Sequence, residues 1–426
     1  MIIQHLKRAF NIFKDNPYAG LIAILGTALS ITMLMSFFIG NRCHTMNIKP
    51  ESDRDRTLYV KWVGVKYKEN DNLLVNGSLS LKTIQACFRS LKSPEAIVVT
   101  SPLQPRLVSV AKSNERRKAY VLFTDDMFWK MFHFKLLSGA PYTREEFEAG
   151  IKKVVLGEKL AKTLFGSSAA AIGKNIQLSY VNYSVCAVVE DVSSMADYSF
   201  AQAWVPYTSA NLAATADPAG VTGKYRCQIF AHSSHDFSVI RKELSKQVEV
   251  FNAALGDYYV DFYKQPDSRL IETWRFGPGY PDAKGHLLSS FVLFAILLII
   301  PAINLSGFTM SRMKKRISEL GVRRCFGSTR TGLIVQVLLE NMIYSVIGGI
   351  LGLFLSYWVL YLIRDRLIST NYWGLDVGVT IPVETFFNIP TFIAVFSFCL
   401  LLNLLSASIP AWRVTSVPIV NSLNNE

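Results

Sequence analysis

Few side chains of this 426-residue sequence have the types and spacing needed for catalysis or metal binding. His232 and His235 lie three residues apart, but no cysteine is near them, so we interpret them as solvated loop histidines. Asp125 and Asp126 resemble paired carboxylates, yet they precede a predicted helix, where the helix dipole favours acids. Neither a nucleophile motif nor the phosphate-binding G-x-x-x-x-G-K-[ST] loop is present. We therefore expect no metal site, no catalytic site and no directly bound cofactor.

The most informative segment is basic and lies between two long apolar stretches. Residues 312–330 contain seven Lys or Arg and a single acid, Glu319. Short basic loops of this kind stay in the cytoplasm. The segment therefore predicts the orientation of the whole chain.

The same segment has helical periodicity. Ile317, Leu320 and Phe326 are expected to form an apolar stripe, Gly327 is expected to end the helix, and Thr331 is expected to cap the next one. Two interpretations are open on physical grounds. One is a basic helix held by lipid headgroups, and the other is a helix that presses into a groove on a soluble partner.

Four charge-poor apolar stretches predict four membrane-spanning helices, because a span needs about 20 apolar residues. The first is too long for a cleaved signal peptide, whose apolar part has about 7–15 residues. We assign the spans to residues 18–40, 287–310, 333–363 and 389–410. On the cytoplasmic side, we then expect an interfacial helix at 1–17, a coupling helix at 311–332 and a tail at 411–426. On the outer side, we expect a large domain at 41–286 and a loop at 364–388.

The net charge of +13 does not indicate nucleic-acid binding. No basic stripe interleaved with aromatic residues is present, and the basic residues are concentrated at 312–330. This concentration is what anionic lipid of the inner leaflet and the orientation rule produce. The predicted surface partner is therefore membrane lipid.

The outer region mixes strand-like and helix-like runs, which predicts an α+β domain. The predicted strands are Thr57–Val65, Ala96–Thr100, Ala119–Thr124, Lys153–Leu156 and Asn175–Glu190. The predicted helices are Ser80–Leu91, Asp125–Phe132, Glu158–Phe165 and Phe237–Leu255. Its four cysteines allow three pairings, and their spacing makes free thiols at least as plausible, for Cys43, Cys87, Cys186 and Cys227.

The basic segment resembles the R-x-x-E-[IL]-G-[IV]-R-[RK]-x-x-G motif of the FtsX-like permease domain, which MacB-type ABC transporters share. The matching residues are Arg316, Glu319, Leu320, Gly321, Arg323, Arg324 and Gly327. The motif continues into a Q-x-x-x-E, here Gln336 and Glu340. The carboxyl end is similar to the family's P-A-x-R-x-x-x-x-x-P pattern, through Pro410, Ala411, Arg413 and Pro418.

The outer region resembles the MacB-type periplasmic core. Its matching positions are Phe128, Leu137, Gly139, Leu160-Ala161, Phe165-Gly166 and Ile172-Gly173-Lys174. The resemblance implies a bacterial inner-membrane protein with both termini in the cytoplasm. It also implies a periplasmic domain built from a porter-like lobe and an inserted lobe.

The family resemblance further implies partners and a mechanism. Such permeases are dimers that work with an ABC ATP-binding subunit, which holds ATP and Mg²⁺. The coupling helix contacts that subunit through Arg316, Ile317, Glu319, Leu320, Gly321, Arg323, Arg324 and Gly327. Gln336 and Glu340 would brace this helix, with Arg323 or Arg324 as the basic neighbour that an acid at the membrane edge needs. ATP binding would then move the periplasmic domains through stiff helices.

The sequence departs from the full MacB pattern because no ATPase domain precedes the first span. We therefore expect the ATPase in a separate chain, and a homodimer or a pairing with a related permease. A periplasmic adaptor or an outer-membrane channel would be a further partner of an exporter. Two alternatives stay open: a non-transporting FtsX-like signalling or scaffold subunit, and a lipoprotein-releasing permease. No motif identifies a cargo or its direction.

Overall fold

A computed structural model describes residues 17–110, 116–210, 212, 217–314, 322, 325–367 and 389–415. The chain forms two compact units, which we describe separately. One contains Met1–Arg42, Lys284–Trp373 and Pro382–Glu426, and the other contains Cys43–Ala283 with Gly374–Ile381. Residues 1–16 of the predicted interfacial helix, residues 315–321, 323 and 324 of the coupling helix, most of the outer loop and most of the tail lie outside the described residues.

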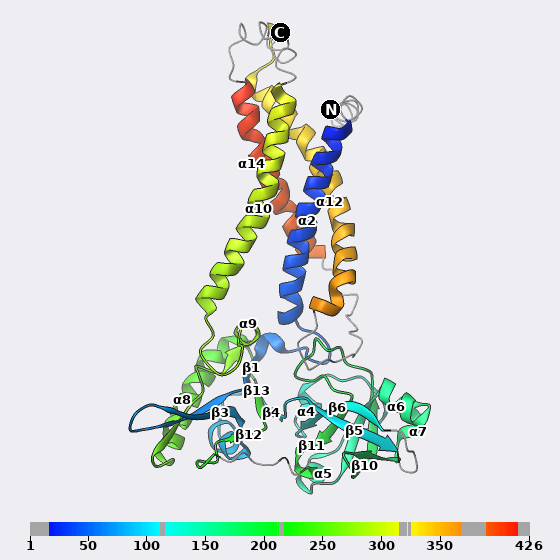
Figure 1. The fold of residues 1–426 in the computed structure, drawn as a ribbon, viewed down its shortest axis with the longest axis vertical. Coiled ribbons are helices and arrows are strands. Elements are labelled where there is room, and N and C mark those ends of the chain that lie inside the picture. Colours follow the sequence, from blue (N-terminus) through cyan, green and yellow to red (C-terminus); the bar gives the residue numbers. More distant parts are fainter. Residues whose placement is uncertain are drawn as a thin grey trace. The chain divides into compact units, whose positions relative to one another are not determined.

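The first unit consists of long apolar helices (Figure 1). They are α2 (Pro17–Thr45), α10 (Ala283–Lys314), α12 (Arg330–Leu367) and α14 (Ile389–Thr415). Within the described residues, three segments are long and apolar enough to cross a membrane: Gly20–Arg42, Arg330–Leu362 and Phe392–Arg413. The corresponding apolar part of α10 is the shorter Ala283–Leu297. The fourth span therefore stays a prediction.

Helices α2 and α12 approach each other at two glycines of α12. A Cβ atom at Gly348 would lie 2.8 Å from the carbonyl oxygen of Ile24, and one at Gly352 would lie 2.7 Å from that of Ala28. The close approach lets the Thr32 hydroxyl donate a hydrogen bond to the Gly352 carbonyl, at 3.1 Å. Small residues of this kind allow backbones of membrane helices to meet.

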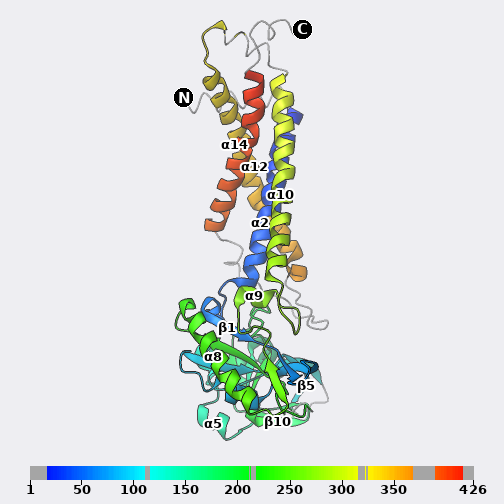
Figure 2. The ribbon, with the colours of Figure 1, turned by 90° about the vertical axis from the view of Figure 1, so that its left-hand side faces the viewer.

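Polar and aromatic side chains connect the remaining helices. The Asn403 amide of α14 donates to the Ser345 hydroxyl of α12 at 3.1 Å, and both side chains are buried. The Phe294 ring of α10 packs against Phe38 of α2 and Phe398 of α14, with centroid distances of 5.6 and 5.9 Å. Figures 1 and 2 show the helices of this unit running side by side.

The second unit is α+β, as predicted. Within the described residues it has an 11-stranded sheet. Its strands are β1 (Thr57–Val60), β4 (Ala96–Thr100), β5 (Gln104–Val110), β6 (Arg117–Thr124), β7 (Leu136–Gly139), β8 (Lys153–Gly157), β9 (Asn175–Leu178), β10 (Val181–Val189), β11 (Ala203–Pro206), β13 (Arg226–Phe230) and β15 (Asp267–Ser268). A 4-stranded sheet contains β2 (Val63–Tyr67), β3 (Leu73–Leu79), β12 (Thr222–Gly223) and β14 (Tyr258–Asp261).

Six strands of the large sheet close into a ring. Strand β6 pairs antiparallel with β5 and parallel with β11, and the order β11-β8-β10-β9-β5 completes the circuit. Side chains alternate between two cores with the period of two expected for strands. On β11, Ala203 and Val205 pack into one core while Trp204 packs into the other.

The helices of this unit are mostly short and cover the edges of the cores. They are α3 (Leu81–Thr83), the π-helical η2 (Ile84–Phe88), α4 (Phe128–Met131), α5 (Arg144–Glu148), α6 (Glu158–Phe165), α7 (Ser168–Ala171), α8 (Phe237–Ala253) and α9 (Arg269–Thr273). The longest, α8, buries Ile240, Leu244 and Phe251 in a third core. Residues 43–283 belong to one compact unit, so the separate porter-like and inserted lobes stay a prediction.

Two predicted strands are each broken in two. The run Thr57–Val65 divides into β1 and β2 because the amides of Lys61 and Trp62 donate to the Gln265 side-chain oxygen, at 2.7 and 3.3 Å. The run Asn175–Glu190 is a hairpin of β9 and β10, whose turn places Ser179 and Tyr180 at positive φ.

Two predicted helices are shorter than expected. The helix predicted at Ser80–Leu91 is α3 followed by η2, and Ser80 caps it by accepting from the Thr83 amide at 3.1 Å. The helix predicted from Asp125 begins at Phe128, and the Asp125 carboxylate lies before it and accepts the Phe128 amide at 3.0 Å.

Candidate functional site

Most residues predicted to contact an ATPase fall outside the described part of the chain. These are Arg316, Ile317, Glu319, Leu320, Gly321, Arg323 and Arg324, and Pro418 of the carboxyl-terminal motif lies outside it as well. Gly327 is described, and its φ of 89° is the left-handed value that a glycine after a helix end adopts. Their roles therefore stay predictions.

The turn after Gly327 leads into α12 with a cap different from the predicted one. The hydroxyl of Thr329, not that of Thr331, accepts the Gly332 amide at 3.2 Å. Thr329 is the residue directly before α12, which is the position where a hydroxyl can satisfy a free helix amide.

The Q-x-x-x-E and P-A-x-R motifs meet in a small apolar core of the helical unit. Val337, which follows Gln336, is 4% exposed and packs with the fully buried Ala411. Ala411 lies between the motif residues Pro410 and Arg413. The structure thus brings together two motifs about seventy residues apart, whereas the side chain of Glu340 is not described.

The outer unit contains a buried network of charged side chains that the sequence did not reveal. Arg54 is 1% exposed, Glu51 and Glu272 are each 3% exposed, and Arg269 is 6% exposed. Burying a charge is costly unless it is paired and hydrogen-bonded. The partners of these groups therefore explain why they can lie here.

Arg54 bonds the segment that follows α2, residues 46–54, to the 195–199 loop. Its Nε pairs with the Glu51 carboxylate at 2.6 Å, and its Nη1 donates to the Met46 carbonyl at 3.2 Å. The other terminal nitrogen donates to the carbonyl of Met195 and lies 3.6 Å from Asp197. One guanidinium thus joins the 46–54 segment to the 195–199 loop.

Arg269, the first residue of α9, connects the carboxyl-terminal part of the domain to the end of α2 and to the 195–199 loop. Its Nε donates to the His44 carbonyl at 2.7 Å, and its Nη1 donates to the Glu272 carboxylate at 2.8 Å. Its Nη2 lies 3.0 Å from Asp197 Oδ1. Asp197 therefore lies between the two arginines.

Two acids of the network, Glu51 and Glu272, are each held by several donors. One oxygen of Glu51 accepts the amides of Tyr198 and Ser199 and the Ser199 hydroxyl, each at 2.9 Å. The Tyr198 hydroxyl donates to Glu272 at 2.9 Å, and the ammonium of Lys61 pairs with the same carboxylate. Charges satisfied in this way do not attack a substrate, so the cluster indicates a structural connection rather than a catalytic site.

The electrostatics favour the ionised forms of Asp197 and Arg269. Burial alone would raise the pKa of Asp197, but Arg269, Arg54 and Lys61 lower that pKa below its usual value. Burial works against the charge of Arg269 as well, yet Asp197 and Glu272 raise its pKa well above the usual value. Both members of this ion pair are therefore charged at neutral pH.

The other candidates singled out in the sequence have structural surroundings. Asp125 is fully buried: Oδ1 accepts the Phe128 amide at 3.0 Å, and Oδ2 accepts Arg89 at 2.6 Å and the Val99 amide at 2.9 Å. Burial raises its pKa to about 6, although Arg89 and the Val99 amide act in the opposite direction. The interpretation of Asp125 as a group at a helix amino end is confirmed.

Three of the four outer cysteines are free thiols. They are Cys87, Cys186 and Cys227, of which Cys87 and Cys227 are buried. Burial raises the pKa of Cys87 to about 12 and that of Cys186 to about 11, so both are protonated and unreactive at neutral pH. Among the described residues, no group of three His, Cys, Asp or Glu side chains is placed to hold a metal ion.

Two family models match separate parts of the chain. Residues 21–232 match the MacB-like periplasmic core domain, and residues 291–419 match the FtsX-like permease C-terminal domain. The chain belongs to the MacB- and FtsX-like ABC transporter permeases. The apolar helices and the periplasmic-type domain of this permease fit an inner-membrane protein.

Curated relatives agree with this assignment. The permease is 21% identical over 273 residues to the ABC transporter permease YknZ of Bacillus subtilis, covering 63% of this chain and 64% of YknZ. It is 24% identical over 277 residues to the macrolide export ATP-binding/permease protein MacB 1 of Yersinia pestis, covering 63% of this chain and 39% of MacB 1. The matches thus span less than two thirds of these relatives.

Solved structures were also compared with the permease. The periplasmic region of MacB from Actinobacillus actinomycetemcomitans has 15% identity and a TM-score of 0.35, covering 51% of this chain and 91% of that chain. The extracellular domain of YknZ has 14% identity and a TM-score of 0.31, covering 47% of this chain and 100% of that chain.

Proposed function

We propose that this permease is the transmembrane subunit of a MacB/FtsX-type ABC transporter. It would couple ATP hydrolysis in a separate ATP-binding subunit to a conformational change of its periplasmic domain. The observation that carries the proposal is the presence, on one chain, of both family domains, with the FtsX-like part containing the basic segment 312–327. Export is the favoured direction, because the related MacB 1 protein is named as an exporter.

The helix at 312–326 would receive the motion from the ATP-binding subunit. Its apolar stripe would enter a groove on that subunit, while Arg316, Arg323 and Arg324 would lie at the rim. It is joined directly to α10 on one side and, through the Gly327 turn, to α12 on the other. A displacement of the coupling helix would therefore move the second and third spans together.

The buried network would receive that motion in the outer domain. Helix α2 continues to Thr45, whose neighbours His44 and Met46 are bonded to Arg269 and Arg54. Helix α9, which begins at Arg269, precedes α10 in the chain. The same network binds the end of α2 and the start of α9. A movement of the first or the second span would therefore displace the same group of buried side chains. This arrangement supports mechanotransmission in a dimer of four-span permeases.

Affinity purification of the tagged full-length chain from its native membrane tests the proposal. We expect one ATP-binding protein with a phosphate-binding loop to co-purify in comparable amount, together with a second permease copy. A periplasmic adaptor or outer-membrane channel in the same eluate would support export, whereas a cell-wall hydrolase would support the signalling alternative. Absence of any nucleotide-binding chain above the level seen with an unrelated multi-pass protein would contradict the proposal.

A further inference from the structure

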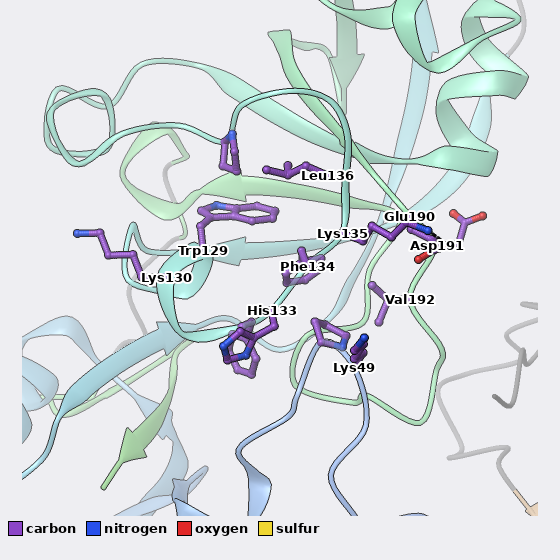
Figure 3. A pocket seen from close by; sticks show the side chains of 13 residues that line it. Lys49, Trp129, Lys130, His133, Phe134, Lys135, Leu136, Glu190, Asp191 and Val192 are labelled. Atoms are coloured by element: carbon purple, nitrogen blue, oxygen red, sulfur yellow. Dashed lines mark hydrogen bonds and ion pairs between the residues drawn. The ribbon is translucent and has the colours of Figure 1, made fainter. Parts of the chain in front are cut away.

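A cavity of about 650 Å³ opens in the outer unit (Figure 3). Three segments line it: Lys49-Pro50, the stretch from Trp129 to Leu136 with Pro141, and Glu190–Val192. Its volume lies within the roughly 300–1,000 Å³ that small-molecule sites occupy. The cavity is therefore large enough for a molecule of drug-like size.

The apolar part of the cavity is an aromatic surface held in place from behind. The rings of Trp129 and Phe134 lie with centroids 5.0 Å apart, and both contact the buried Trp204, at 6.1 and 5.3 Å. Phe128 packs against both rings as well, at 5.2 and 5.4 Å. Figure 3 shows Trp129 and Phe134 at the centre of the lining. Such fixed rings offer contact area without a large loss of side-chain entropy.

The charged groups around this surface leave an excess of positive charge. Glu190 pairs with Lys135 at 3.2 Å, and Asp191 accepts the Lys159 amide at 3.2 Å. Lys49 and Lys130, in contrast, form no ion pair with any residue that the structure describes. The lining thus holds three lysines, Lys49, Lys130 and Lys135, against two acids, and the Lys49 ammonium is available for an anion.

The cavity wall is also part of the segment that carries the buried network. The His133 amide donates to the Pro50 carbonyl at 2.9 Å, and the His133 ring lies 3.6 Å from Asp53. Glu51 and Arg54, on the same short segment, belong to the network. An occupant that contacts Lys49 and Pro50 would therefore touch the segment fastened to the end of α2.

We propose that this cavity binds a small amphipathic anion, with a carboxylate, sulfonate or phosphate head on an aromatic or alkyl body. The head would lie beside Lys49 and the body would cover Trp129 and Phe134. Lys130, whose ammonium points away from these rings on the opposite side (Figure 3), would add to the positive potential around the cavity. Identification of this ligand as transported cargo rests on the proposed function. The binding itself does not, because it needs neither nucleotide nor a second subunit.

Photolabelling of the full-length chain in lipid nanodiscs tests the site. The probe is 4-benzoylbenzoate, an aromatic anion, and its counterpart is the corresponding benzylamine cation of the same shape. Peptide mapping by mass spectrometry locates the label, which separates cavity labelling from partition into lipid. We expect the anion to label peptides within 127–142 or 190–192 at least ten-fold more than the cation.

Charge-reversing variants then test whether the lysines of the cavity bind the anion. Lys49→Glu with Lys130→Glu should reduce anion labelling at least ten-fold, whereas Lys242→Glu with Lys246→Glu, on exposed positions of α8, should leave it unchanged. All four lysines are exposed, so unaltered thermal unfolding of both double variants will confirm folding. Equal labelling by the two probes, full labelling of the Lys49/Lys130 variant, or no label in the cavity peptides would each overturn the proposal. A negative result here would leave the ATPase co-purification unaffected.

Discussion

The guanidinium of Arg269 donates a 2.7 Å hydrogen bond to the main-chain carbonyl of His44, which lies 225 positions earlier in the chain. His44 belongs to the last turn of α2, and Arg269 is the first residue of α9. One buried side chain thus holds both ends of the outer domain. Under the proposed function, this bond would lie where movement of the first span enters the domain.

Removing Arg269 should destabilise the outer domain strongly. In Arg269→Leu, Asp197 and Glu272 stay buried without their main cation, and breaking a buried pair in this way costs about 3–5 kcal/mol. Urea unfolding of the full-length protein in detergent, followed by tryptophan fluorescence, measures the change. Arg144→Ala is the matched control, because the Arg144–Glu148 pair is exposed. Equal midpoints for the two variants would show that the network carries no special stability.

The pH dependence of stability should contain a contribution from Asp125. Its pKa is raised from 3.8 to about 6, so the folded protein binds this proton more tightly than the unfolded chain does. The contribution of Asp125 to the free energy of unfolding is therefore greatest below pH 4 and decreases as the pH rises. Above pH 6 this contribution is smaller by about 3 kcal/mol.

Comparison of wild type with Asp125→Asn isolates that contribution. The free energy of unfolding of the wild type, relative to the variant, should decrease between pH 4 and pH 6 and then become constant. Urea titrations at half-unit pH intervals give the curve. A difference that is independent of pH over this range, or that increases, would show that burial does not dominate at Asp125.

The close approach of α2 and α12 should not tolerate larger side chains. In Gly348→Leu or Gly352→Leu, the new Cβ would lie under 3 Å from a backbone oxygen of α2, which cannot move aside as a side chain can. We expect a loss of about 1–3 kcal/mol, seen as a lower midpoint of thermal unfolding in detergent. Gly26→Leu, on α2 itself, meets nothing within 4 Å and should unfold as the wild type does.

Much of the local structure could be predicted where the hydrophobic pattern of a segment matches the way that segment packs in the fold. The run Ala96–Thr100 is β4, and Glu158–Phe165 is α6, with the predicted limits. Strands such as β5 were not predicted, because Gln104–Val110 contains a proline and alternates only weakly. The Ser179-Tyr180 turn was also missed, since neither residue commonly adopts positive φ.

The site was less predictable because its parts are distant in the sequence. The coupling motif at 312–327 is a local pattern of charge and periodicity, so it could be found without a structure. Arg54 and Arg269 each have an acid three residues away, Glu51 and Glu272, but Asp197 is far from both arginines in the sequence, and the spacing gives no sign that it contacts them. Their pairing depends on long-range folding of β1, β15 and the 195–199 loop. A buried arginine with an acid three residues away has nearly the same local pattern as a surface ion pair, so sequence alone does not distinguish the two.

The central claim is that the helix at 312–326 couples this permease to an ATP-binding subunit. The most direct measurement is stimulated ATP hydrolysis by the co-purified complex in proteoliposomes, for wild type, Leu320→Asp and Ser318→Asp. By helical spacing, Ser318 lies on the opposite face of the helix from Leu320. The Ser318→Asp variant therefore adds the same charge to the other face and serves as the control. Leu320→Asp should reduce stimulated hydrolysis at least ten-fold with membrane insertion intact, while Ser318→Asp should keep most of it. Full stimulated hydrolysis in Leu320→Asp would contradict the account.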